Sequence, residues 1–182
     1  MRGHTLIELS AILAILALLA SFALPDAQRL IQEIRAETAI HSVRGAIAYA
    51  RATAATHNRP VLLCPLDDQD RCHGDWSRGF AVFIDLRGSA ERDPKAPILR
   101  HFPALAEGSA LRFRAFGSGR YLRMLPNGQT GWQNGRFEYC PPAGSGVRPR
   151  ALVLNLQGRG RIIEPEAIDP HRRTGALRVV QC

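Results

Sequence analysis

The stretch RGHTLIELSAILAILALLASFALP, residues 2–25, joins a short polar start to a long apolar run. Residues 9–24 are sixteen residues without a charge. With residues 5–7 the stretch reaches about 20 residues, enough for a helix to cross ~30 Å of hydrocarbon. Glu8 interrupts it, and a carboxylate inside a membrane helix costs roughly 2.5–3.5 kcal/mol on insertion scales. The segment therefore predicts a membrane helix in which Glu8 either pairs with another group or has a functional role.

An ordinary secretory signal peptide ends its apolar centre at a small-residue cleavage site. Residues 20–28, ASFALPDAQ, offer only a weak site after Ala20 or Ala23. The helical pattern also continues, because apolar residues recur at spacings near three and four, at Ala27, Leu30, Ile31, Ile34, Ile40, Val43, Ile47, Ala50 and Ala54. One long helix, first apolar and then amphipathic, is predicted to about residue 57, since Pro60 bars its continuation.

Residues 3–9, GHTLIEL, followed by an apolar stretch and Pro25, resemble the class III signal of type IV pilins and type II secretion pseudopilins. The resemblance implies that a prepilin peptidase cleaves after Gly3 and that the new N-terminus, His4, is methylated. His4 stands where the family usually has Phe. The hydrophobic helix would be retained, first as a membrane anchor and later in the core of a filament. A plain single-pass anchor is the alternative interpretation.

Glu8 and Pro25 are the predicted assembly residues. After cleavage, Glu8 would meet the positive N-terminal amine of a neighbouring subunit and escape the penalty of burial in lipid. Pro25 removes one backbone hydrogen bond, which predicts a kink or local melting of the helix. The expected organisation is a leader at 1–3, a transmembrane and filament-core helix at 4–28, and a globular domain at 29–182. The expected location is the inner membrane, single-pass with a periplasmic head, and then the pilus or pseudopilus.

Beyond Pro60, short β-type runs alternate with turn residues. They are VLLC (61–64), FAVFID (80–85), ILRHF (98–102), LRFRAF (111–116), YLRML (121–125), RFEYC (136–140), ALVLNL (151–156), RII (161–163) and LRVV (177–180). LRFRAF places apolar residues on one face and Arg112 and Arg114 on the other, as in a half-buried strand with a solvated basic face or a binding strip. The predicted fold class is α+β, a long N-terminal helix packed on an antiparallel β-sheet head, as in pilins and pseudopilins.

The positive charge of the chain is concentrated in its C-terminal half. The net charge is +8, yet residues 1–99 carry 11 basic and 11 acidic side chains while residues 100–182 carry 13 and 5. Lys95 is the only lysine. A GC-rich coding sequence explains the preference for arginine but not its segregation, which favours a polyanionic partner.

Four cysteines stand at 64, 72, 140 and 182 without a CxxC pair. Together with a membrane signal, they indicate two disulfides in an oxidising compartment, with zinc as the alternative because His73 adjoins Cys72. Three connectivities are open from the spacing. Loop closure and the family resemblance both favour Cys64–Cys72 with Cys140–Cys182, at ~2–4 kcal/mol for each bridge. The second bridge would hold residues 157–181 as a constrained loop.

Within that loop lies QGRGR, residues 157–161, in which two glycines permit a turn that projects two arginines. The resemblance here narrows to the GspH/FimT branch, whose late GRxR motif is linked, in FimT-like minor pilins, to DNA binding during natural transformation. A solvated β-turn is the alternative. The predicted DNA-binding residues, which would contact phosphates without sequence specificity, are Arg159, Arg161, Arg148, Arg150, Arg172, Arg173 and Arg178.

The sequence contains no GxSxG, HExxH or P-loop motif, so no enzyme and no cofactor are predicted. DDQD, residues 67–70, lacks the spacing of a calcium loop, and the six histidines are scattered, so no metal site is predicted. The leading hypothesis is a FimT-like minor pilin that captures extracellular DNA. The alternatives are a GspH-like pseudopilin of type II secretion without a DNA role, and a membrane-tethered envelope hydrolase. The expected partners are other pilins or pseudopilins, prepilin peptidase, the inner membrane and DNA.

Overall fold

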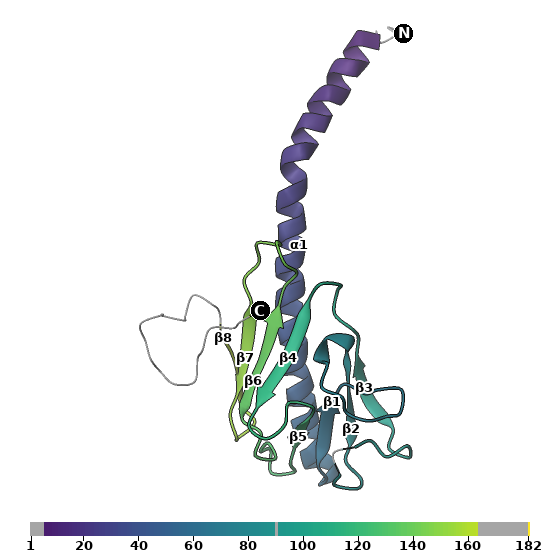
Figure 1. Cartoon of the computed structure of the whole chain (residues 1–182), viewed down its shortest axis with the longest axis vertical. Helices are drawn as coiled ribbons and strands as arrows, with labels where there is room; N and C mark the ends of the chain where they lie inside the picture. The colour runs from purple at the N-terminus through teal and green to yellow at the C-terminus, as the bar shows by residue number, and fades with distance from the viewer. Residues whose placement is uncertain (1–5, 90, 164–181) are drawn as a thin grey trace, which may run out of the picture.

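A single long helix begins near the N-terminus and packs against the β-rich head with its C-terminal half. The computed structural model describes residues 6–89, 91–163 and 182, with the side chains at positions 20, 22, 23 and 25 excepted. Helix α1 (Leu6–His57) extends far beyond the β-rich head (Figure 1). It stays helical at position 25 and its N-terminal half curves, so the local melting predicted there is absent. A proline removes only one backbone bond, and the bonds on either side hold the helix together.

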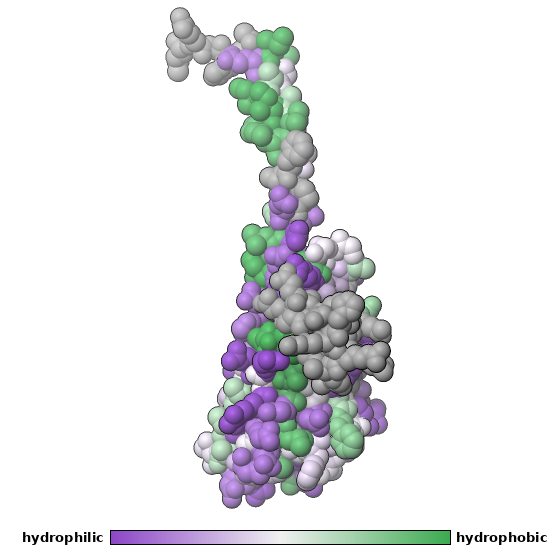
Figure 2. Space-filling model, turned by 90° about the vertical axis from the view of Figure 1, so that its left-hand side faces the viewer, coloured by the Kyte–Doolittle hydropathy of each residue, from purple (hydrophilic) through white to green (hydrophobic). Residues whose placement is uncertain are grey.

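The N-terminal half of α1 exposes an apolar surface that nothing in the described chain covers. Figure 2 shows this surface near the N-terminal end of the helix. The large exposed apolar side chains are Leu6, Ile7, Leu9, Ile12, Leu13, Ile15, Leu16, Leu18, Leu19, Leu24, Leu30, Ile31 and Ile34. So many exposed apolar side chains on one helix mark a site of interaction with a protein or a membrane.

In a search of the described residues, no helix combines the length and the apolar character needed to cross a membrane.

Within the described residues, the head has two antiparallel sheets of four strands each. The first has the order β3-β2-β1-β5 and contains β1 (Val61–Cys64), β2 (Phe80–Ile84), β3 (Ile98–Phe102) and β5 (Leu122–Met124). The second has the order β4-β6-β7-β8 and contains β4 (Ala110–Ala115), β6 (Gly135–Cys140), β7 (Arg150–Leu154) and β8 (Gly160–Ile163). A short 3-10 helix, η1 (Trp76–Arg78), precedes β2. Eight predicted runs are thus strands, and the ninth, residues 177–180, lies outside the described residues.

Small side chains let the C-terminal half of α1 pack against both sheets. The helix contacts β1, β2 and β5 of the first sheet and β6, β7 and β8 of the second (Figure 1). Ala36, Ala46, Ala50 and Ala54 are all completely buried at this junction. An alanine face brings the helix axis close to the strands, so the larger residues Ile40, Val43 and Ile47 fill the space beside it. The confirmed α+β fold depends on this close approach.

An aromatic cluster around Trp76 joins the two sheets, because this ring lies 5.3 Å from the Phe80 ring of β2 and also contacts two rings of the second sheet. The Trp76 ring lies 4.9 Å from the Phe137 ring and 5.7 Å from the Phe113 ring, both edge to face. Its Nε1 donates a hydrogen bond of 2.8 Å to the Gly119 carbonyl. A buried tryptophan is stable only when its N–H has a partner, and here that bond also fixes the loop after β4.

Both disulfides are present, in the pairing that the resemblance implies. Cys64 at the end of β1 is bonded to Cys72, and Cys140 at the end of β6 is bonded to the final residue, Cys182. All four sulfur atoms are therefore occupied, which rules out the zinc alternative for them. Among the described residues, no group of three or more histidine, cysteine or acidic side chains is placed so that it could hold a metal ion.

The acidic loop inside the first disulfide is an ordered turn. Asp67 Oδ1 accepts hydrogen bonds from the backbone N–H groups of Gln69 (2.9 Å) and Arg71 (2.8 Å). The Arg71 N–H is the main reason that the pKa of Asp67 is lowered. Asp70 forms an ion pair of 2.6 Å with Arg92. These carboxylates therefore stabilise the loop of the first disulfide.

Enlarging the alanine face should separate the helix from the sheets. We expect Ala50→Leu to lower the free energy of unfolding by about 1–3 kcal/mol through overpacking, and so to lower Tm by several degrees. Ala52→Leu, at an exposed position two residues away, is the control. Thermal unfolding of the full chain in detergent, followed by circular dichroism, measures both. Equal Tm values for the two variants would contradict the importance of this contact.

Candidate functional site

The QGRGR segment forms the turn of the β7–β8 hairpin. The backbone N–H of Asn155 donates to the Arg159 carbonyl at 3.2 Å, and the N–H of Gly158 donates to the Asn155 carbonyl at 3.0 Å. The Asn155 side chain also accepts a hydrogen bond of 2.9 Å from the Arg159 N–H. Gly158 has a φ of +69°, a conformation that glycine adopts without strain. The turn predicted at the glycines is therefore confirmed.

Gly158 fixes the hairpin against helix α1. It is buried, and a Cβ there would lie 2.5 Å from the Gly128 carbonyl oxygen and 2.8 Å from Met124 Cε. Arg51 of α1 donates from Nη1 to the Gly158 carbonyl oxygen at 3.3 Å. The turn therefore has little freedom to move relative to the helix, and Arg159 beside it is held in place.

Three arginines converge at this junction. Arg44 and Arg51 of α1 and Arg159 of the hairpin line one cavity of about 240 Å³, which we call the helix–hairpin cleft. The remaining residues of its wall are apolar or glycine: Ile47, Ala48, Leu152, Gly158 and Gly160. Among the described residues, three arginines and no acidic residue line the cleft, so these residues give it a positive potential that attracts anions.

Arg44 and Arg51 were not among the predicted site residues. Their separation of seven residues places them on one face of a helix, and that spacing was the available signal. It did not reveal that this face meets the hairpin, because Arg51 and Gly158 are 107 residues apart in the chain.

Arg161 belongs to the opposite face of the second sheet. Its neighbour Ile162 packs on the core, and successive residues of a strand point to opposite faces, so Arg161 lies on the face away from the core. In the register of the sheet, Arg114 pairs with Arg136, Arg136 with Val153, and Val153 with Arg161. These residues therefore form one line across all four strands. We call Arg114, Arg136 and Arg161 the arginine row.

One buried carboxylate forms ion pairs with two members of the arginine row. Glu138, with a side chain only 1% exposed, pairs with Arg114 at 2.8 Å and also with Arg136. Arg161 is exposed and forms no ion pair among the described residues. The row thus keeps an excess of positive charge, while Glu138 holds two of its side chains in a fixed geometry. Arg112 and Arg114 are exposed on this basic face, and Leu111 and Phe113 are buried on the other, as predicted.

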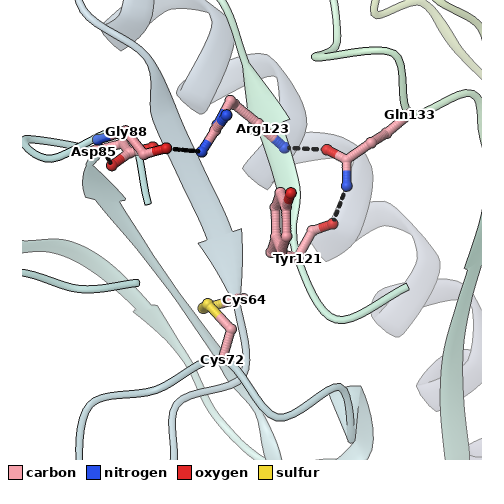
Figure 3. A network of polar contacts seen from close by, with 7 residues as sticks. All are labelled: Cys64, Cys72, Asp85, Gly88, Tyr121, Arg123 and Gln133. Atoms are coloured by element: carbon pink, nitrogen blue, oxygen red, sulfur yellow. Dashed lines mark hydrogen bonds and ion pairs between the residues drawn. A yellow bond between two sulfur atoms is a disulfide. The ribbon is translucent and has the colours of Figure 1, made fainter. Parts of the chain in front are cut away.

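A hydrogen-bonded network fixes the loop that follows β5. Asp85, whose side chain is fully buried, pairs with Arg123 Nη2 at 2.8 Å. The Arg123 backbone N–H donates to Gln133 Oε1 at 2.8 Å, and Gln133 Nε2 donates to the Tyr121 carbonyl at 2.7 Å (Figure 3). The backbone N–H of Thr130 donates to the Leu156 carbonyl at 2.9 Å. This loop is therefore attached directly to the hairpin.

The other predicted residues lie away from the cleft or outside the described chain. Arg150 is half-buried and begins β7, and Arg148 is exposed two residues before it, whereas the hairpin turn follows the end of β7. The predicted residues outside the described chain are Gly3, His4, Arg172, Arg173 and Arg178. The acidic residues Glu164, Glu166 and Asp169 are outside it as well. Glu8 is an exposed residue of the first turns of α1.

A side chain at position 158 should displace the hairpin from α1. We expect Gly158→Ala to destabilise the fold by the cost of a positive φ, about 1–3 kcal/mol, plus the cost of the contact with Gly128. Gly144→Ala is the matched control, because Gly144 has a φ of +76° but a Cβ added there would meet no atom within 4 Å. Chemical denaturation of both variants measures the difference. An equal or larger loss for Gly144→Ala would contradict the tight fit.

Comparisons with known proteins agree with this fold. The family model described as Type II transport protein GspH matches residues 39–158. The type IV minor pilin FimU of Pseudomonas aeruginosa is similar, with a TM-score of 0.55 and 20% identity over 75% of this chain and 92% of that chain. The minor pseudopilin EpsH from the Type 2 Secretion System of Vibrio cholerae is also similar, with a TM-score of 0.53 and 13% identity over 72% of this chain and 98% of that chain.

At these identities the two solved structures establish a shared fold. No curated protein sequence matches the chain significantly. The family match ends at Gly158, immediately before Arg159, and so includes neither Arg159 nor Arg161. It nevertheless spans more than half of the sequence. The chain therefore belongs to the GspH family of type IV pilin-like minor pilins and pseudopilins, a family of structural subunits rather than of enzymes.

Proposed function

We propose that the chain is a FimT-like minor type IV pilin that binds extracellular DNA for natural transformation. The observation that carries this proposal is the helix–hairpin cleft, where Arg44, Arg51 and Arg159 converge and no carboxylate of the described residues forms part of the wall. Guanidinium groups bind phosphates with two parallel hydrogen bonds, which makes phosphodiesters suitable ligands. The charge excess of the C-terminal half is consistent with such a polyanionic ligand.

The hairpin offers basic groups on both sides of the second sheet, one from the turn before β8 and one from β8 itself. Arg159 lies on the side of α1, and Arg161 lies in the arginine row on the other face. Since β8 is the outermost described strand of its sheet, a nucleic-acid backbone that crosses its edge can contact both faces in succession. Contacts of this kind bind phosphates and read no bases, so the affinity should be independent of sequence and weaken strongly with salt.

The exposed apolar half of α1 supports the assembly part of the proposal. In this account, prepilin peptidase removes residues 1–3, His4 is methylated, and residues 4–28 anchor the subunit in the inner membrane until it enters the pilus. The apolar side chains from Leu6 to Ile34 would then pack against other pilins. Glu8 would neutralise the N-terminal amine of a neighbouring subunit, which lowers the cost of burying both charges.

A second candidate function is a minor pseudopilin of type II secretion. The description of the matching family and the likeness to EpsH favour it. In that case the subunit would assemble with other pseudopilins, and the arginines would have no nucleic-acid ligand. Binding to DNA and dependence of secretion on the subunit separate the two candidates.

Removing the hairpin arginines should weaken DNA binding. We expect Arg159→Ala/Arg161→Ala to lower the affinity for duplex DNA and to reduce the slope of log K against log salt by about 2, because about 0.9 counterion is released for each phosphate contact. The measurement is a titration of the full chain in a nonionic detergent at several salt concentrations.

Arg35→Ala/Arg78→Ala removes the same charge from exposed positions outside the cleft and the arginine row, and it should leave the slope almost unchanged. Equal losses in the two double variants would show that net charge alone governs binding. If the unaltered chain fails to bind DNA at low salt, the DNA-binding proposal is wrong and the secretion candidate gains support.

Loss of the carboxylate at position 8 should affect assembly and spare insertion. We expect Glu8→Ala to remain in the membrane, because the substitution removes a charge from an apolar segment. It should be excluded from filaments, because the neighbouring amine loses its partner. Fractionation of membranes and sheared filaments from cells that carry the variant measures both outcomes. Glu8→Asp, which keeps the charge, is the control, and normal incorporation of Glu8→Ala would contradict the proposed pairing.

A further inference from the structure

Two aromatic side chains of the head are almost fully exposed. Phe116 is 76% exposed and Trp132 is 77% exposed, whereas the other tryptophan, Trp76, is buried to 1%. Neither exposed ring stacks on another aromatic ring within the described residues. Burial of these rings contributes nothing to the fold, so their large apolar faces are available to a ligand.

Phe116 lies next to the arginine row. It follows β4, where alternation places it on the outward face with Arg112 and Arg114. Its backbone N–H donates to the Asn134 carbonyl at 3.0 Å, which extends the pairing of β4 with β6 by one residue. Trp132 is two residues from Asn134, a distance of about 7 Å at most along an extended chain. The two residues therefore lie near each other, at the same end of the second sheet.

Trp132 is also adjacent to the β7–β8 hairpin. Thr130, two residues earlier, donates to the Leu156 carbonyl from its backbone N–H at 2.9 Å. Gln133, the next residue, is held by the network of Figure 3. The tryptophan thus stands on a fixed loop between the arginine-bearing turn and the end of β4.

The backbone of Trp132 is held in an unfavourable conformation. Its φ is +66°, in the left-handed region that bulky residues rarely adopt. The Trp132 N–H donates to the Thr130 carbonyl at 2.7 Å, and the Gly131 N–H donates to the Arg123 carbonyl at 3.0 Å. A strained residue with an exposed side chain, fixed on both sides by hydrogen bonds, is characteristic of a ligand contact.

We propose that Trp132 and Phe116 stack on unpaired bases, and that the ligand of this surface is single-stranded DNA. This inference rests on the proposed function, because the arginines supply the attraction for the phosphates. The bases of a duplex are already stacked on one another, whereas those of a single strand present free π faces. Aromatic rings beside a basic track are the combination that binds single strands without sequence preference.

Intrinsic fluorescence reports the proposed contact directly. The chain has two tryptophans, and Trp76 is buried, so a change in emission on binding arises at Trp132. We expect oligo(dT) to quench the emission of the full chain in nonionic detergent, with a titration midpoint equal to the Kd measured by anisotropy of a labelled oligonucleotide. Trp132→Phe should bind and lack the quenching. Saturating binding of oligo(dT) without quenching would overturn the proposal.

The second measurement compares affinities for a single strand and a duplex of equal length at one salt concentration. The unaltered chain should prefer the single strand, and Trp132→Ala and Phe116→Ala should each weaken its binding about five-fold or more while duplex binding stays the same. Trp132→Phe should restore most of the preference. Ile98→Ala, at an exposed apolar position of β3 in the other sheet, should change neither affinity.

The outcomes separate this inference from the proposed function. Loss of binding to both ligands in Arg159→Ala/Arg161→Ala, together with unchanged single-strand affinity in Trp132→Ala, would refute the stacking inference alone. No binding of either ligand by the unaltered chain would refute both. If Trp132→Ala keeps its preference for single strands but enters filaments poorly, the aromatic pair is an interface with another pilin and the inference is wrong.

Discussion

The close packing of the alanine face of α1 against both sheets is the contact on which the rest of the head depends. Ala46, Ala50 and Ala54 allow the helix to touch strands of both sheets, so one helix packs against both layers. On the flank of this contact, Arg51 reaches the Gly158 carbonyl and Gly158 lies against Gly128. The position of the hairpin is therefore a consequence of how near the helix lies to β7 and β8.

The electrostatics of the head follow from where carboxylates are placed. Buried carboxylates, Asp85 and Glu138, are used to fix Arg123, Arg114 and Arg136 in defined positions. The cleft and the hairpin have no such partner among the described residues, so Arg44, Arg159 and Arg161 keep their charge available. Because these side chains are exposed, an anion can bind them without a large loss of hydration, which suits weak and reversible association.

The sequence predicted the elements well because their signals are local. Three of these signals depend on neighbours a few residues apart. They are the end of α1 shortly before Pro60, the alternation of Leu111, Arg112 and Phe113, and the glycine turn at 157–161. The cleft depends on a contact across 107 residues, so Arg44 and Arg51 gave no sign of meeting Arg159. The arginine row likewise requires the strand order β4-β6-β7-β8, which periodicity does not determine. Trp132 was overlooked because its exposure comes from an unusual loop conformation and not from a pattern.

Helix α1 contributes to two different surfaces, the exposed apolar surface and the helix–hairpin cleft. Its N-terminal half carries the apolar side chains that need covering, and its C-terminal half supplies two of the three arginines of the cleft. The helix is one continuous element, so packing of its apolar half in an assembly fixes the direction in which the cleft faces. The apolar surface begins at Leu6 and ends at Ile34, ten residues before Arg44, or about 15 Å along a helix. In the proposed assembly, packing along the apolar half would leave the basic groups of the head accessible, and a bound anion would contact the same helix that packs against the other subunits.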